Sequence, residues 1–98
     1  MKYECHITID PIIPTAEMHK LIELCDKAKF KVAKLLKEVG FPSNLDQFMT
    51  GHGNEFNELH GRMRLLCLLL KEAGFVIRRY KIEEILVDSR LGDSEGLL

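Results

Sequence analysis

The chain has 98 residues, which is enough for one domain and leaves no room for a second hydrophobic core. Hydrophobic residues make up 46% of it and charged residues 30%, a composition typical of globular proteins. The net charge of -1 argues against a non-specific nucleic-acid binder, because such proteins usually carry a basic excess. We expect residues 1–89 to form a single α+β domain and the polar residues 90–98 to form a flexible C-terminal tail.

The three cysteines, Cys5, Cys25 and Cys67, fit neither a disulfide framework nor a zinc site. Their number is odd, their spacings are long, and no C-x-x-C occurs. All three lie on apolar stripes, so we expect reduced core thiols in a cytoplasmic protein. The start of the chain shows no signal peptide, and the longest apolar run, LLCLLL, is too short to span a bilayer.

Residues 2–10 predict a half-buried strand, because Tyr3, Cys5, Ile7 and Ile9 alternate with polar residues. The prolines of PIIP end this strand, since proline cannot donate to a strand ladder. We expect a helix to follow, with Thr15 as its N-cap. Its apolar stripe recurs at helical spacing and contains Met18, Leu21, Ile22 and Cys25.

Residues 29–36, KFKVAKLL, fit two interpretations. Phe30 and Val32 alternate as in a strand, and β-branched and aromatic residues favour that state. However, several apolar residues of this stretch also continue the helical spacing of the preceding stripe. We favour the strand, and a single helix over residues 16–39 remains the rival.

The second half of the chain predicts a loop, a strand, a helix and a strand. Glycine, proline, serine and asparagine cluster in residues 37–46, which indicates the loop. QFMTGHG predicts a short strand, and we expect Asn54 to cap the helix that follows. That helix has the apolar stripe Phe56, Leu59, Met63, Leu66 and Leu70, and Gly74 suits the position just beyond its end. FVIRRYKIEEILV predicts the last strand.

This order of elements, βαββαβ, predicts a ferredoxin-like α+β fold. Two helices would cover one face of a four-stranded antiparallel sheet. Right-handed crossovers would place the first strand at the centre, between the third and the fourth. The other face of the sheet would then be open to water, a ligand or a partner.

Polar side chains gather on this open face. If Cys5 and Ile7 face the helices, the even-numbered residues of the first strand face outward. On the last strand, we expect Val76 to face the helices and Ile77 to face outward. Arg78 is out of step, because it would face the helices unless a bulge or an edge position relieves it. The outward set is Glu4, His6, Thr8, Asp10, Phe48, Thr50, His52, Ile77, Arg79, Lys81 and Glu83.

These residue types suit an anionic ligand, namely a phosphate ester or a nucleotide. Arginine grips phosphate through two donors, lysine adds a point charge, and hydroxyls donate hydrogen bonds. A histidine can move a proton near neutral pH, so hydrolysis or transfer is a further step. We assign catalytic roles to His6 and His52. The residues expected to bind the ligand are Thr8, Thr50, Arg79, Lys81 and Glu83.

Other interpretations of the face are weighed against this one. The simplest is that the polar residues only cover a solvated sheet face. A metal could bind His6 and His52 with Glu4, Glu83 or Asp10, but no close metal motif is present, so we expect neither metal nor cofactor. The alternative function is a non-enzymatic homo-oligomeric interaction module, in which the long last strand pairs with another chain. We expect neither nucleic acid nor a membrane as a partner.

Features of three families occur here without their full motifs. HIT at residues 6–8 is similar to one H-x-T half of the two-histidine phosphoesterases, which carry two such motifs. Length and element order are similar to acylphosphatases, whose glycine-rich phosphate loop is replaced by PIIPTAE. The RNA-recognition motif shares the order, but only Phe48 is aromatic among the matching outward positions. We therefore assign the chain to none of them.

Overall fold

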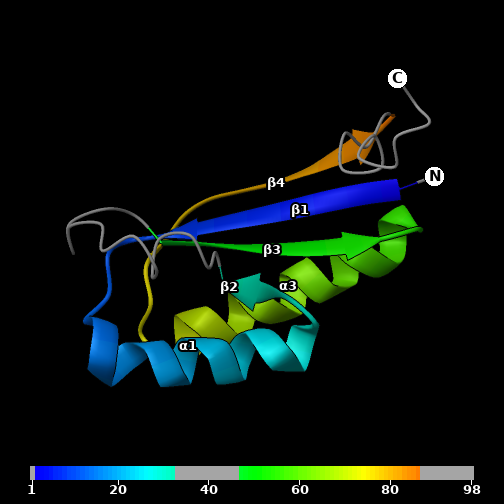
Figure 1. The fold of residues 1–98 in the computed structure, drawn as a ribbon. Coiled ribbons are helices and arrows are strands. Elements are labelled where there is room, and N and C mark those ends of the chain that lie inside the picture. Colours follow the sequence, from blue (N-terminus) through cyan, green and yellow to red (C-terminus); the bar gives the residue numbers. More distant parts are fainter. Residues whose placement is uncertain (1, 33–46, 87–98) are drawn as a thin grey trace, which may run out of the picture.

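The computed structural model describes residues 2–32 and 47–86, and this part of the chain forms an α+β fold (Figure 1). The elements are β1 (Lys2–Ile9), α1 (Pro14–Ala28), β2 (Lys31–Val32), β3 (Gln47–Gly53), α3 (Phe56–Glu72) and β4 (Ile77–Ile85). The four strands form one sheet in the order β2-β3-β1-β4, and all neighbours are antiparallel. The predicted central position of the first strand, between the third and fourth, is confirmed.

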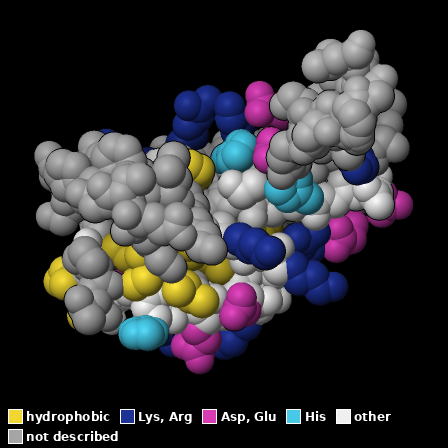
Figure 2. Space-filling model, in the orientation of Figure 1, with side chains coloured by type: hydrophobic (Ala, Val, Ile, Leu, Met, Phe, Trp, Pro, Cys, Tyr) yellow, Lys and Arg dark blue, Asp and Glu magenta, His cyan; other side chains and the backbone are white. Residues whose placement is uncertain are grey.

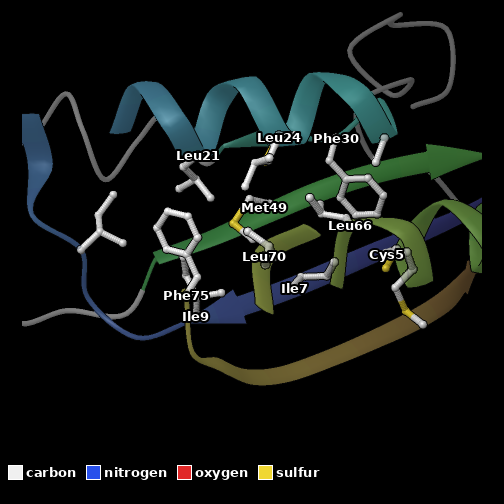
Figure 3. Close-up of a cluster of buried hydrophobic side chains, with 14 of the residues drawn as sticks. Cys5, Ile7, Ile9, Leu21, Leu24, Phe30, Met49, Leu66, Leu70 and Phe75 are labelled. Atoms are coloured by element: carbon white, nitrogen blue, oxygen red, sulfur yellow. The ribbon is translucent and has the colours of Figure 1, made fainter. Parts of the chain in front are cut away.

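Both described helices lie on the same side of the sheet, and the core fills the space between these layers (Figures 1 and 3). The side chains of Cys5, Ile7 and Ile9 are 0% exposed, so β1 turns its odd-numbered residues toward the helices as predicted. Full burial of an aliphatic side chain of this size contributes about 1.5–3 kcal/mol. The helices contribute Leu21, Leu24, Cys25, Ala28, Leu59, Met63, Leu66 and Leu70 to the same cluster.

The single helix over residues 16–39 is wrong, because α1 ends at Ala28. Lys29 adopts a left-handed conformation with φ 60°, and its N–H donates to the carbonyl of Asp26 at 3.2 Å. The Phe30 N–H donates to the Cys25 carbonyl at 2.8 Å, so the chain leaves the helix in a hydrogen-bonded turn. The strand that follows is described for Lys31–Val32 only. The expected loop over residues 37–46 and the expected tail over residues 90–98 lie outside the described residues.

Both predicted N-caps are wrong by one or two positions. α1 begins at Pro14 with Ile13 as the N-cap residue, since proline at the first helical position loses no hydrogen bond. The Ile13 N–H instead donates to the Glu17 carboxylate at 2.6 Å. α3 has Glu55 at its N-cap, not Asn54. The predicted end of α3 is confirmed, because Gly74 follows Ala73 with φ 93°.

A β-bulge in β4 settles the position of Arg78. Thr8 pairs with Arg79 and Ile9 pairs with Ile77, so Arg78 is an extra residue in the ladder. Its Nε lies 3.3 Å from Asp10 Oδ1, outside the core. The predicted faces of Val76 and Ile77 are wrong for the same reason. Ile77 packs against the core and Val76 is 52% exposed, because the bulge reverses the alternation at this point.

Gly51 of β3 leaves room for the side chain of Phe30, which lies between α1 and β2. The ring of buried Phe30 lies against Gly51, and a Cβ on this glycine would sit 2.7 Å from two ring carbons. No side chain fits there without displacement of the ring. None of the helices in the described ranges is both long enough and apolar enough to cross a bilayer.

Candidate functional site

Strand register brings the predicted site residues onto one face of the sheet in three rows. The first row runs Phe48–Thr8–Arg79, the second Thr50–His6–Lys81, and the third His52–Glu4–Glu83. These residues alternate with the buried Cys5, Ile7 and Ile9, so they lie on the face opposite the helices. Directly paired residues of antiparallel strands have Cβ atoms roughly 5 Å apart, which puts neighbours in each row within side-chain reach.

A chain of polar contacts joins four side chains across this face. Thr50 Oγ1 lies 3.1 Å from His6 Nδ1, and His6 Nε2 lies 3.4 Å from Glu4 Oε1. The other carboxylate oxygen of Glu4 lies 3.0 Å from His52 Nε2. The two histidines therefore do not contact each other, and Glu4 links them.

The carboxylate of Glu4 favours a proton on the nitrogen that each imidazole turns toward it. An ionised carboxylate only accepts hydrogen bonds, so His52 Nε2–H donates to it at 3.0 Å, and a proton on His6 Nε2 faces it at 3.4 Å. His6 Nδ1 is then left to accept a hydrogen bond from the Thr50 hydroxyl. Hydroxyl, imidazole and carboxylate thus stand in the order that holds a general base in one tautomer. Glu4 was expected on this face, because even-numbered residues of β1 point away from the helices. Sequence analysis did not assign it a ligand-binding or catalytic role.

Positive charge on this face is concentrated on β4. Arg79 is exposed beside Thr8, and no ion pair joins it to any residue in the described ranges. Lys81 stands beside His6, with Nζ 3.5 Å from the Glu83 carboxylate. Lys31 of β2 pairs with Thr50 and extends the second row by one more cation.

The face is divided into a cationic end and an acidic end. Glu83 pairs directly with Glu4, so two carboxylates and His52 form the row farthest from Arg79. A bound anion is repelled from that row and attracted to Thr8, Arg79 and Lys81. Of the predicted binding residues, Glu83 therefore orients Lys81 and does not itself suit contact with an anion. In Figure 2, histidine, cationic and acidic side chains lie close together in the upper part of the view, and the hydrophobic side chains gather mainly lower down, where a histidine and further charged side chains also lie.

Residues for a metal are not brought together in the described part of the chain. No group of three or more histidine, cysteine, aspartate or glutamate side chains there has an arrangement that could hold an ion. Asp10, which we considered as a third ligand, is occupied by Arg78 at 3.3 Å.

Arg62 of α3 supports the site from below, and sequence analysis did not identify it. Its Nε donates to the Ala28 carbonyl at 2.9 Å, and its two terminal nitrogens donate to the carbonyls of His52 at 2.7 Å and Lys29 at 2.6 Å. Its side chain is only 15% exposed and lies over the Phe30 ring. Sequence analysis could have identified Arg62 from its position in the helix. It falls beside the buried apolar stripe of α3, where a charged side chain needs hydrogen-bond partners.

A hollow of about 560 Å³ opens beside Arg62 at the edge of the same face. Its polar lining comes from Glu4, Lys29, Lys31, Thr50, His52 and Arg62. The hollow therefore continues the cationic second row toward β2, and it offers space for the part of a ligand that extends beyond its charged group.

The cysteines are free thiols held in the protonated form. Burial raises the pKa of Cys5 to about 12 and that of Cys25 to about 12. Burial also raises the pKa of the Cys67 thiol. Since the thiolate is the reactive form, these residues do not supply a nucleophile at neutral pH.

Comparison of the chain with known families, curated proteins and solved structures found no match.

Proposed function

We propose that this protein binds a phosphate-containing small molecule, a phosphate ester or nucleotide, on the open face of its sheet. The observation that carries the proposal is the position of Arg79 and Lys81 directly beside Thr8 and His6. Two cations, a hydroxyl and an imidazole thus meet on neighbouring strands. Arg79 has no carboxylate partner among the described residues, so its donors are available to a phosphate.

We also propose that the fold belongs to the ferredoxin-like class and that the protein acts in the cytoplasm. The order of helices and strands and the sheet order β2-β3-β1-β4 support the fold assignment. Three free cysteines, of which two are fully buried, support a reducing compartment.

Hydrolysis or transfer of the bound group is the extension of this proposal. His6 Nδ1 lies 3.1 Å from the Thr50 hydroxyl, so it would take a proton either from this hydroxyl as the attacking group or from a water that replaces it as the hydrogen-bond partner. The Glu4 carboxylate would stabilise the resulting imidazolium. His52, which we expected to be catalytic, donates its Nε2 proton to the other oxygen of Glu4 at 3.0 Å and lies in the acidic row, so it would act by orienting this carboxylate.

Titration with inorganic phosphate, ADP and ATP, followed by NMR and calorimetry, tests the binding. Arg79→Ala is expected to weaken binding about tenfold or more, because it removes a bidentate charged contact. Arg79→Lys should recover only part of the loss. Arg64→Ala is the matched control, since Arg64 is also exposed but lies on α3. Equal affinity of Arg79→Ala and the wild type, or no binding of any of the three ligands, would contradict the proposal.

The reaction is tested separately from binding. We expect His6→Ala to retain the melting temperature, because a part-exposed polar residue contributes little to stability. If the wild type releases phosphate from an ester substrate and His6→Ala does not, His6 is catalytic. If neither releases phosphate while both bind it, the protein is a binding protein and the extension is wrong.

The alternative is a non-enzymatic homo-oligomeric interaction module. The long β4 strand at the end of the sheet favours it, because such an edge has backbone groups available to another chain. Protection of the His6 and His52 resonances in an oligomer, together with no response to phosphate, would favour this alternative.

A further inference from the structure

β4 is an edge strand whose outer side has no neighbour in the described sheet. It pairs with β1 on one side only, along Ile77–Ile85. Exposed edges of this length invite pairing with another strand, since their outer N–H and C=O groups lack partners in the ladder. Edge strands are often protected by charges that repel a second copy. The charges of β4 do the opposite.

Charges in β4 are arranged so that the strand complements itself when it is reversed. Arg78 and Arg79 stand at its beginning, Glu83 and Glu84 near its end, and Lys81 in the middle. In an antiparallel pair centred on Lys81, Arg79 of one copy faces the partner's Glu83. Arg78 adds no such pair, because it is the extra residue of the bulge and contacts Asp10. A two-fold axis repeats the Arg79–Glu83 pair, which gives two oppositely charged pairs on the open face.

We propose that two copies of this chain pair through antiparallel β4 strands about a two-fold axis at Lys81, which joins their sheets into one. In this register, residues that lie opposite each other in the two strands are on the same face of the joined sheet. Arg79 and Glu83 both lie on the open face, whereas Tyr80 and Ile82 both lie on the helix face. The two helix layers then lie on the same side of the joined sheet.

Apolar residues on the helix side of β4 fit the same contact. A hollow of about 900 Å³ lies between α3 and β4, with Leu65, Leu68, Ile77 and Tyr80 among its lining residues. Leu68 and Tyr80 are each 57% exposed. In the proposed register, the partner's Ile82 lies opposite Tyr80 and covers part of this surface, which removes apolar area from water.

A register centred on Ile82 is the competing arrangement. It would pair Lys81 with the partner's Glu83 but would place Arg79 opposite the partner's Ile85 and Tyr80 opposite the partner's Glu84. Both registers form two oppositely charged pairs, but only the Lys81 register places Tyr80 opposite an apolar residue, the partner's Ile82. The Lys81 register brings two lysines together at the axis, and each is compensated by its own Glu83 at 3.5 Å.

Charge reversal on the full chain tests both the dimer and its register by sedimentation equilibrium. The wild type is expected to reach twice the 11.3 kDa mass of one chain. Arg79→Glu alone turns both of these cross-strand pairs into glutamate–glutamate pairs, and Glu83→Arg alone turns both into arginine–arginine pairs. Each variant is expected to weaken self-association about tenfold or more, since both pairs change from attractive to repulsive.

An equimolar mixture of the two variants makes the test independent of folding defects. In the mixed dimer, the glutamate introduced at position 79 of one copy faces the arginine introduced at position 83 of the other. The unchanged Glu83 and Arg79 face each other in the second pair. Both pairs are again attractive, so the mixed dimer should form with near wild-type affinity.

Two kinds of result would overturn the inference. A monomeric wild type at about 1 mM, where even a millimolar Kd would be detected, would overturn the dimer. Association unchanged by Arg79→Glu, or no recovery in the mixture, would overturn the Lys81 register. Arg79 takes part in both proposals, but the dimer is tested by mass in the absence of phosphate, so its failure can be told apart from a failure of phosphate binding.

Discussion

One terminal nitrogen of Arg62 donates a 2.7 Å hydrogen bond to the carbonyl of His52, which ties the centre of α3 to the end of β3. The same guanidinium donates to the carbonyls of Ala28 and Lys29, where α1 ends. One side chain therefore donates to three backbone carbonyls from two elements. It also fixes the strand end that carries one of the two histidines of the open face.

Arg62→Ala is expected to lower the free energy of unfolding by about 2–4 kcal/mol, because it leaves these carbonyls without their charged donor. Arg62→Lys should recover only part of this, since one ammonium cannot reach three carbonyls in the geometry of a guanidinium. Urea unfolding measures the difference. Arg64→Ala is the control, two positions along the same helix, and should change stability by less than about 0.5 kcal/mol. Equal effects of the two alanine variants would contradict this role of Arg62.

Gly51→Ala should destabilise the fold by about 1–3 kcal/mol, because the new Cβ would overlap the ring of Phe30. Gly61→Ala should instead be neutral or stabilise by up to about 1 kcal/mol, since nothing lies within 4 Å of a Cβ there and alanine favours the helix. Thermal and urea unfolding of the two variants check the contrast. Phe30→Leu should reduce the cost of Gly51→Ala in the double variant, and strict additivity would show that the two residues do not conflict.

Glu4→Gln is expected to raise the affinity for phosphate about two- to fivefold at low salt, because it removes a negative charge one row away from the proposed site. The gain should shrink at about 0.5 M salt, where charges are screened over a few ångströms. Glu84→Gln is the matched control, since it removes the same charge from the opposite side of β4. Weaker binding by Glu4→Gln would mean that Glu4 supports the ligand by orienting His6, and would contradict the simple electrostatic role.

Stability should fall as the pH rises from about 9 toward 12. Burial raises the pKa of Cys5 and of Cys25 from an ordinary value of 9.0 to about 12. Above pH 9 the unfolded chain releases these protons and the folded chain retains them, so alkaline conditions favour unfolding. Urea unfolding between about pH 8 and pH 10.5 measures the slope. Cys25→Ala should show a shallower slope, whatever its absolute stability, and an identical slope would contradict the contribution of this thiol.

Alternation was the part of the sequence that predicted structure best. In β1, side chains change faces with every residue, so Cys5, Ile7 and Ile9 could be placed in the core and His6 and Thr8 opposite them. The rows that join β1 to β3 and β4 follow from this parity, once the strands pair in register. Grouping His6, Thr50 and Lys81 was therefore within reach of sequence analysis.

Features that depend on backbone geometry were only partly within reach. Arg78 breaks the alternation, which indicated a bulge or an edge position, but the sequence did not show that the bulge would exchange the faces of Val76 and Ile77. The role of Glu4 as a bridge between two imidazoles depends on side-chain conformations. Arg62 donates to carbonyls at the end of α1 and the end of β3, and these come within reach of one side chain only in the folded chain.

The bulge also makes Arg78 an extra residue in the strand. Ile9 would still pair with Ile77, and Thr8 with Arg79, in a regular ladder without it. A related chain of shorter length could therefore lack this position, losing the contact with Asp10 but turning no other side chain around. Deletion of Lys81 would have a different consequence. Each side chain beyond the deletion would turn to the opposite face of the sheet, so that polar residues would face the helices and apolar residues would face the open side. Variation in length should thus be tolerated in β4 at Arg78 and selected against in the strand's interior.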